Sequence, residues 1–212
     1  MNAVVTYFQT YGGEYWQEVG QHLLLSGLAL AISLVIALPL GYWGSKQPRV
    51  AAVCTAFSQL LRIVPSLALL FLLIPLLGTG LVPALVALVA LALPPLLVNT
   101  VLGFTQVDPT LKEGGGALGM DARQLRRQVE LPLALPYLLN GVKLALVEII
   151  ASASLAAYIG AGGLGVLIFT GLGLYNLTYV TIGGGSVALL SLATMVGFDL
   201  LIKKVKANGP GN

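Results

Sequence analysis

The chain has 212 residues, of which 57% are hydrophobic and only 9% are charged, whereas about 25% of residues are charged in a typical soluble domain. This composition excludes an ordinary soluble protein and indicates an all-α, polytopic membrane protein. The net charge of +3 does not indicate a nucleic-acid partner, because the cations stand at the ends of apolar runs and not in one basic face. The single cysteine, Cys54, excludes a disulfide within the chain.

In chain order, residues 1–20 are polar and aromatic, as expected of a short segment at the membrane interface. Apolar runs long enough to cross a bilayer follow. They predict about five membrane-spanning helices in a single transmembrane domain covering residues 1–212, at residues 21–44, 50–77, 81–104, 136–157 and 180–202. The Pro65–Ser66 break in the second run predicts two half-helices or a kinked span. The uncharged, glycine-rich stretch 158–178 is expected to be external or re-entrant.

Lysine and arginine residues gather on one side of this five-span scheme. They follow the first span, the third span and the fifth span, at Lys46, Arg49, Lys112, Arg123, Arg126, Arg127, Lys203, Lys204 and Lys206. Cytoplasmic loops carry an excess of these residues. We therefore expect the N-terminus outside and the C-terminus in the cytoplasm.

The longest polar stretch, residues 108–136, lies between the third and fourth predicted spans. Within it, Glu113, Gly119 and Val129-Glu130-Leu131-Pro132 stand in the order E-x5-G-x9-V-x-L-P. This spacing resembles the cytoplasmic signature of the permease subunits of bacterial ATP-binding-cassette importers. The resemblance implies that residues 108–132, the coupling loop, form two short helices, the first of which docks on a nucleotide-binding subunit. Leu131-Pro132 would end the second helix before the fourth span.

Three further blocks are similar to the osmoprotectant branch of that family, which serves glycine betaine, carnitine and choline. They are LLRIVPSLALLFLLIPLLG at 60–78, VDPTL at 107–111 and ASLAAYIGAGGLGVLIFTGL at 153–172. The resemblance covers about residues 20–203 and implies a permease that moves quaternary-ammonium solutes by alternating access. A methionine-type importer permease, which shares five spans and a similar Gly-Gly-Leu-Gly block, is the alternative within the family.

The resemblance also implies partners in the bacterial inner membrane: two ATPase subunits, a second permease copy or homologue, and an extracytoplasmic substrate-binding protein. No Gly-x4-Gly-Lys-[Ser/Thr] loop occurs in the sequence, so we expect ATP and Mg²⁺ on the partner ATPase, and no cofactor or metal on this chain. The chain is then a transport subunit and not an enzyme. The residues expected to couple it to the ATPase are Glu113, Gly114, Gly115, Ala117, Gly119, Met120, Leu131 and Pro132.

Gly114 and Gly115 replace the paired alanines usual in the family signature, and Gly116 extends the run. A glycine inside a helix costs roughly 1 kcal/mol relative to alanine. We therefore expect a weak start to the first coupling helix, with docking on the ATPase supplying part of its order. The three arginines that follow have helical spacing, and face an acidic partner, anionic headgroups or simply the cytoplasm.

Arg62 and Glu148 are the ionisable residues deepest in the predicted spans, both on the order of 18 Å from the cytoplasmic side by helical rise. Equal depth permits an ion pair, and a gate contact between two permease copies or a contact with substrate are the alternatives. Lys143, nearer the cytoplasm, is expected to extend to the headgroups. Broken helices expose backbone groups to a cavity. The candidate gate or pathway residues are Arg62, Pro65, Ser66, Glu148, Tyr158, Gly160, Gly162 and Gly163.

Aromatic rings bind quaternary ammonium groups, and several rings are predicted near the outer side, where packing is the alternative role: Tyr158, Phe169, Tyr175 and Tyr179. Two other functional classes remain to be weighed. An intramembrane enzyme would use Glu148, His22 or Asp199, but these residues form no metal or nucleophile–base pattern. A channel or scaffold subunit would need no coupling loop.

Overall fold

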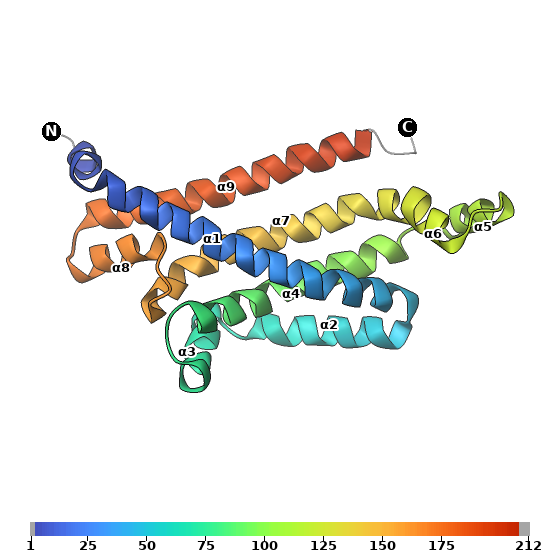
Figure 1. Ribbon diagram of the computed structural model, residues 1–212, viewed down its shortest axis with the longest axis horizontal. Helices are drawn as coiled ribbons and strands as arrows, with labels where there is room; N and C mark the ends of the chain where they lie inside the picture. The colour runs from blue at the N-terminus through green and yellow to red at the C-terminus, as the bar shows by residue number, and fades with distance from the viewer. Residues whose placement is uncertain (1–2, 208–212) are drawn as a thin grey trace.

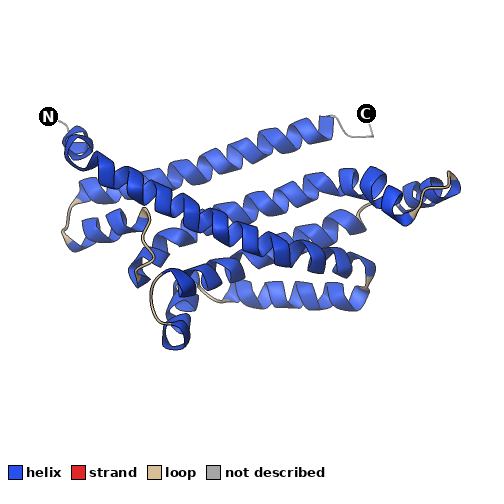
Figure 2. Ribbon diagram, in the orientation of Figure 1, coloured by secondary structure: helices blue, strands red, loops and turns tan. Residues whose placement is uncertain are grey.

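The structure, a computed structural model, describes residues 3–207, and in this range it consists of helices and short connections (Figure 2). Long helices run along the long axis of the molecule (Figure 1): α1 (Ala3–Lys46), α4 (Leu81–Thr105), α7 (Leu131–Ala156) and α9 (Leu177–Ala207). These four, α7 with the turns that flank it, are long and apolar enough to cross a membrane. The expected all-α polytopic fold is confirmed.

The fifth candidate span is broken. α2 (Pro48–Ile63) and α3 (Ser66–Leu77) are both apolar, but they are bent by 94° at Val64–Pro65. At a rise of 1.5 Å per residue, neither reaches across the roughly 30 Å hydrocarbon core alone. The two half-helices expected from the Pro65–Ser66 pair are therefore present, because a proline disfavours helical geometry in the residue before it.

α4 lies at the centre of the bundle, in contact with α1, α2, α3 and α7. Its Ala84, Ala87 and Ala92 are fully buried. Where α7 crosses it, a Cβ on Gly141 would lie 2.8 Å from Cβ of Asn99, so the two backbones approach closely. Small residues allow this close packing, which holds helices together in lipid. The coupling loop extends from the bundle at the end opposite α8 (Figure 1).

The N-terminal segment differs from the sequence expectation. The chain is helical from Ala3 to Lys46 (α1), with a kink at the non-helical residue Tyr11, so helix begins well before the predicted start of the span at residue 21. Aromatic residues are neutral in a helix, and Tyr7 gains stability by packing on Tyr179, with ring centroids 5.0 Å apart. The start of α1 thus packs against the start of α9.

The glycine-rich stretch 158–178 contains η2 (Ala157–Ile159, a 3-10 turn) and α8 (Gly165–Gly173). α8 has 9 residues, about 14 Å at helical rise, so it is too short to cross a membrane. It packs on α7 and α9. The chain turns through it and enters α9 at the same end of the bundle (Figure 1).

One expectation near α7 is wrong. Leu131-Pro132 does not end a helix, because α6, η1 and α7 form one helical run from Ala122 to Ile159, and Pro132 lies near the start of α7. The Lys143 ammonium lies 2.6 Å from Oδ1 of Asp199 on α9. That pair joins α7 to α9, which buries only Ile182 and Gly183.

Candidate coupling loop and membrane cavity

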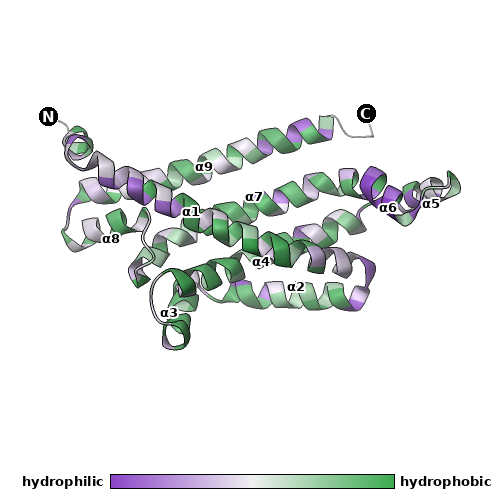
Figure 3. Cartoon of the chain, in the orientation of Figure 1, coloured by the Kyte–Doolittle hydropathy of each residue, from purple (hydrophilic) through white to green (hydrophobic). Residues whose placement is uncertain are grey.

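The coupling loop forms two short helices and a wide turn: α5 (Pro109–Ala117), α6 (Ala122–Leu125) and η1 (Arg126–Glu130, a π-helix). Its polar character stands out against the apolar bundle (Figure 3). Asp108 caps α5 by accepting a 2.8 Å hydrogen bond from the Thr110 amide, and Pro109 is the first helical residue. The same hydrogen bond lowers the pKa of the Asp108 carboxyl below its ordinary value. Asp121 and Gln124 form a reciprocal capping box on α6.

The glycine run lies in the second half of α5 and not at its start, which Asp108 and Pro109 secure. Gly114 is exposed, whereas Gly115 is buried beneath α6, and a Cβ there would lie 2.7 Å from Cδ1 of Leu125. The glycines therefore weaken the end of α5 and not its start. Gly119 ends the turn with a φ of +80°, a conformation that favours glycine. The glycine at this position of the motif thus has a local structural cause.

A largely apolar groove of about 570 Å³ lies between α5 and the start of α7. Four of the predicted coupling residues line it, namely Gly114, Gly115, Ala117 and Met120. Glu113, Gly119, Leu131 and Pro132 are not among its lining residues. Two of its apolar lining residues, Leu111 and Leu118, are 48% and 81% exposed, and a contiguous exposed apolar surface is typical of a site that meets a partner.

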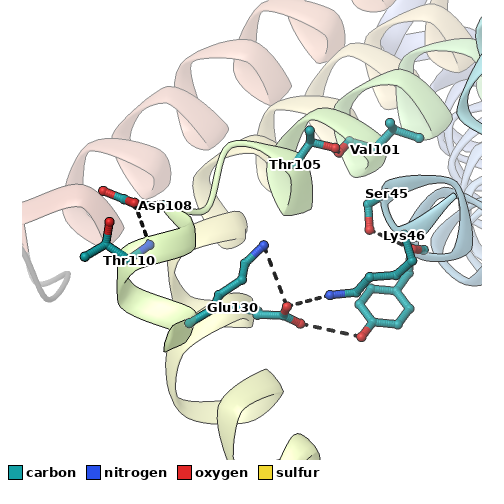
Figure 4. Close-up of polar contacts among 9 residues, drawn as sticks. Ser45, Lys46, Val101, Thr105, Asp108, Thr110 and Glu130 are labelled. Atoms are coloured by element: carbon teal, nitrogen blue, oxygen red, sulfur yellow. Dashed lines mark hydrogen bonds and ion pairs between the residues drawn. The ribbon is translucent and has the colours of Figure 1, made fainter. Parts of the chain in front are cut away.

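Glu130 is the polar centre of this region (Figure 4). Its side chain is 5% exposed, and its Oε1 atom lies 2.5 Å from Nζ of Lys46 and 3.9 Å from Nζ of Lys112. The Tyr42 hydroxyl donates to its other oxygen at 3.5 Å. The Tyr42 ring also lies near two cations, Lys46 Nζ at 5.2 Å and Arg126 Cζ at 5.3 Å from its centroid. Burying a carboxylate requires such pairing.

Sequence reasoning did not single out this cluster. Glu130 occupies the unspecified position between Val129 and Leu131-Pro132 of the motif, and Lys46 was read as a marker of membrane orientation. Their contact depends on how the end of α1 meets η1, across 84 positions of sequence. No feature of the sequence distinguishes Glu130 from the other acidic residues of the coupling loop, which are Asp108, Glu113 and Asp121.

A second site lies inside the bundle, at the break between α2 and α3. A cavity of about 420 Å³ opens there. It brings together four predicted pathway residues, Arg62, Pro65, Ser66 and Glu148, with Pro94 and Pro95 of α4 among the other lining residues. Glu148 accepts a 3.2 Å hydrogen bond from the Ser152 hydroxyl. Among the described residues, the ion pairs do not include one between Arg62 and Glu148, so the predicted direct pair is not formed.

The other pathway candidates do not line this cavity. Tyr158 packs edge-on against Phe71 and Phe169, with centroids 5.5 and 5.1 Å away. Gly162 and Gly163 pack instead on the N-terminal half of α1, where the Gly163 amide donates to Gln21 at 3.2 Å. Gly160, in the left-handed region, ends the 3-10 turn. Gly162 and Gly163 thus join α1 to the loop before α8.

The remaining aromatic candidates, Tyr175 and Tyr179, do not share a site. Tyr179 packs against Tyr7 and, at 6.3 Å, against Tyr11, whereas Tyr175 is 98% exposed. The three residues weighed for an enzyme have unrelated contacts: the Nε2 atom of His22 lies 3.1 Å from the Ile150 carbonyl oxygen, Asp199 pairs with Lys143, and Glu148 lies in the cavity. No two of them lie together in one site.

Solved structures share this helical bundle with its broken span and its loop of short helices at one end. An inward-facing structure of the MetNI methionine ABC transporter superposes with a TM-score of 0.76, over 90% of this chain and 95% of that one, at 24% identity. A crystal structure of an amino acid ABC transporter with histidines gives 0.66, over 92% and 93% of the two chains, at 20% identity. At these identities the likeness establishes the fold.

The chain belongs to the family of inner membrane components of binding-protein-dependent transport systems, which matches residues 29–207. It is 38% identical over 211 residues to the glycine betaine/carnitine/choline transport system permease protein OpuCB of Bacillus subtilis (strain 168), covering 100% of this chain and 96% of that protein. It is 41% identical over 200 residues to the carnitine transport permease protein OpuCB of Listeria monocytogenes, covering 94% and 91%. The glycine betaine/proline betaine permease protein ProW of Escherichia coli (strain K12) is 33% identical over 84% of this chain and 50% of its own length.

Proposed function

We propose that this chain is the membrane-spanning subunit of an ATP-driven importer of quaternary-ammonium osmoprotectants of the glycine betaine, carnitine and choline type. The observation that carries the proposal is the match, over nearly the whole of both chains, to permeases named for these solutes. The support for the methionine-type alternative is a fold likeness at 24% identity. The osmoprotectant class is therefore favoured over methionine.

The cavity chemistry supports the same class. Arg62 and Glu148 line one cavity without being paired to each other. Glycine betaine and carnitine carry a carboxylate and a quaternary ammonium group in one molecule. A zwitterion of this kind places its carboxylate near Arg62 and its ammonium near Glu148, which offsets the cost of leaving either charge unpaired within the membrane. Arg62, Pro65, Ser66 and Glu148 are the residues to which we assign the pathway.

Energy in this proposal comes from partner subunits. Two ATPases that bind ATP and Mg²⁺ dock on the coupling loop, and their closing and reopening drives alternating access. The exposed Leu118 and the adjacent groove supply the apolar contact. A second permease copy or homologue completes the pathway, and an extracytoplasmic binding protein delivers the solute. The N-terminus then lies outside and the C-terminus in the cytoplasm.

The test is reconstitution of the chain with its ATPase and binding protein in lipid vesicles. Uptake of labelled glycine betaine, carnitine and choline is compared with uptake of methionine, with and without ATP. We expect ATP-dependent uptake of at least one quaternary amine and substrate-stimulated ATP hydrolysis. Uptake of methionine alone would overturn the substrate class, and uptake that ignores ATP would overturn the importer assignment in favour of a channel.

A further inference from the structure

We infer that Glu130 is a positioning residue for transport, which ties the cytoplasmic end of α1 to the coupling loop so that movement of the loop reaches α1. This inference rests on the proposed function, in which a partner ATPase moves the loop. The coupling loop packs mainly on itself and on α7, into which it continues. α1 is remote from it in sequence, so a noncovalent contact has to carry any shared movement.

The Glu130 carboxylate is built for this contact. It is the buried residue of η1, and its two lysine partners come from different elements, Lys46 from the end of α1 and Lys112 from α5. One carboxylate thus joins three segments: α1, the first coupling helix and the turn that leads into α7. Since the carboxylate is buried, the attraction is less screened by salt than that of a surface pair.

The π turn explains how Glu130 comes to face inward. The Leu131 amide bonds to the Arg126 carbonyl, five residues back, so the turn holds one residue more than an α-helical turn. An extra residue rotates the following side chains by about 100° around the helix axis, which is the angle per residue at 3.6 residues per turn. Turns of this kind carry a cost and recur at functional positions. Here the turn places Glu130 between Lys46 and Lys112.

Several cations lie around the single carboxylate of Glu130, so loss of its negative charge is harder to tolerate than loss of one cation. Lys46 and Arg126 both lie close to the Tyr42 ring, and Lys46 and Lys112 both pair with the Oε1 atom of Glu130. Without the negative charge of Glu130, these cations face one another. Loss of one lysine leaves the carboxylate paired with the other. We therefore expect neutral Glu130 variants to be impaired far more than Lys46 or Lys112 single variants.

The experiment uses the complete transporter, with ATPase and binding protein, in vesicles. The variants are Glu130→Gln, Lys46→Gln and Lys112→Gln, the double variant of both lysines, and the charge exchange Glu130→Lys with Lys46→Glu. Lys206→Gln, which removes an exposed cation of the C-terminal tail, is the matched control. Uptake and ATP hydrolysis are measured together, so that the ATP consumed per solute imported is obtained. Co-purification of the ATPase is measured for every variant.

We expect Glu130→Gln to retain the ATPase subunits and most ATP hydrolysis while uptake falls by at least about tenfold, as befits the loss of one partner in a buried charge pair. ATP consumed per solute should rise accordingly. The charge exchange should restore part of the uptake, and the single lysine variants should stay within about threefold of wild type because the second lysine remains. A merely structural role would lower uptake and hydrolysis in parallel.

A second readout does not need the solute. ATP binding should change hydrogen exchange at the cytoplasmic end of α1, residues 42–46, in the wild-type complex, and this change should vanish in Glu130→Gln. If wild-type uptake of quaternary amines fails but the exchange response is present and depends on Glu130, the proposed substrate is wrong and the inference stands. Parallel loss of uptake and hydrolysis in Glu130→Gln, or an ATP response of α1 that survives the substitution, would overturn the inference.

Discussion

Arg62 and Glu148 show why single charges inside a bundle are informative. An isolated ionised group is costly within the membrane and is found where it has a partner or meets water. The sequence placed these two at the same depth, and the structure puts both on one cavity. Among the described residues, the ion pairs do not include one between them. Their equal depth follows from helical rise alone, whereas their side-chain contacts depend on how the helices pack.

Substitution of Arg62 should distinguish solutes by their chemistry. Arg62→Gln is expected to raise KM for glycine betaine roughly tenfold or more, since a charge-assisted hydrogen bond contributes about 1.5–3 kcal/mol. Choline has no carboxylate, so its KM should change much less. Glu148→Gln, the matched neutral variant of the other charge, should raise KM for both solutes. Uptake assays over a range of solute concentrations give these values.

An opposite result would restore the direct ion pair. If Arg62→Glu and Glu148→Arg each abolish uptake and the two together recover it, the charges act on one another and not on the solute. Equal effects of Arg62→Gln on glycine betaine and choline would also contradict a carboxylate contact at Arg62.

Asp108 gives a pH prediction at the start of α5. Its folded-state pKa is lowered by the hydrogen bond from the Thr110 amide, so its capping contribution is present above the ordinary carboxyl pKa and is lost as pH falls through the lowered value. Hydrogen exchange of α5 should therefore be slowest, relative to an uncapped helix, near neutral pH. Asp108→Ala should speed exchange of the first turn, and Asp108→Asn, which also caps, should not. Equal exchange in both variants would rule out the cap.

Among elements, α5 shows how far sequence rules extend. The cap at Asp108 and Pro109 and the turn at Gly119 both depend on residue type, but the glycine run led instead to the expectation of a weak helix start, which the cap contradicts. The close fit of Gly115 under Leu125 and the π turn are not readable, because they depend on how α6 folds back on α5. The α2–α3 break was readable from Pro65, but the length of α1 was not: polar residues near the N-terminus gave no sign that Tyr7 packs on Tyr179.

The glycines of α5 and its following turn should respond in opposite directions to alanine. Gly114 is helical and has open space around its Cβ position, so Gly114→Ala is expected to stabilise α5 by roughly 0.5–1 kcal/mol. Gly119 has a φ of +80°, so Gly119→Ala should destabilise the turn by roughly 1–2 kcal/mol. Hydrogen exchange of the loop, with and without the ATPase, measures both. A loss of ATPase binding in Gly114→Ala would mean that the partner needs the bare backbone there.

At the scale of the whole molecule, charge is divided between two ends. The end of α1, the coupling loop and the C-terminal part of α9 lie at one end of the bundle, away from the N-terminus and α8 (Figure 1). All of the lysines and arginines assigned to loops gather there, as the sequence predicted from alternation of spans. The cations stay at one end although one span is broken, because α2 and α3 together still return the chain to the other end.

Cysteine labelling tests the proposed orientation. Cys54 is the single cysteine and is buried, so Cys54→Ala provides a clean background. In that background, Gly12→Cys near the N-terminus should react with a membrane-impermeant maleimide added outside intact cells, and Lys206→Cys should react only after the cells are opened. Labelling of Lys206→Cys in intact cells, or of both positions alike, would refute an external N-terminus.

The break at Val64–Pro65 also arranges backbone electrostatics. α2 ends at Ile63 and α3 begins at Ser66, so the negative end of one helix dipole and the positive end of another, about half a charge each, meet beside the same cavity. α3 begins without a side-chain cap, which leaves its first amides available. A solute bearing both signs of charge is matched there by the main chain itself. The break between α2 and α3 thus favours zwitterionic solutes over simple cations through the main chain alone.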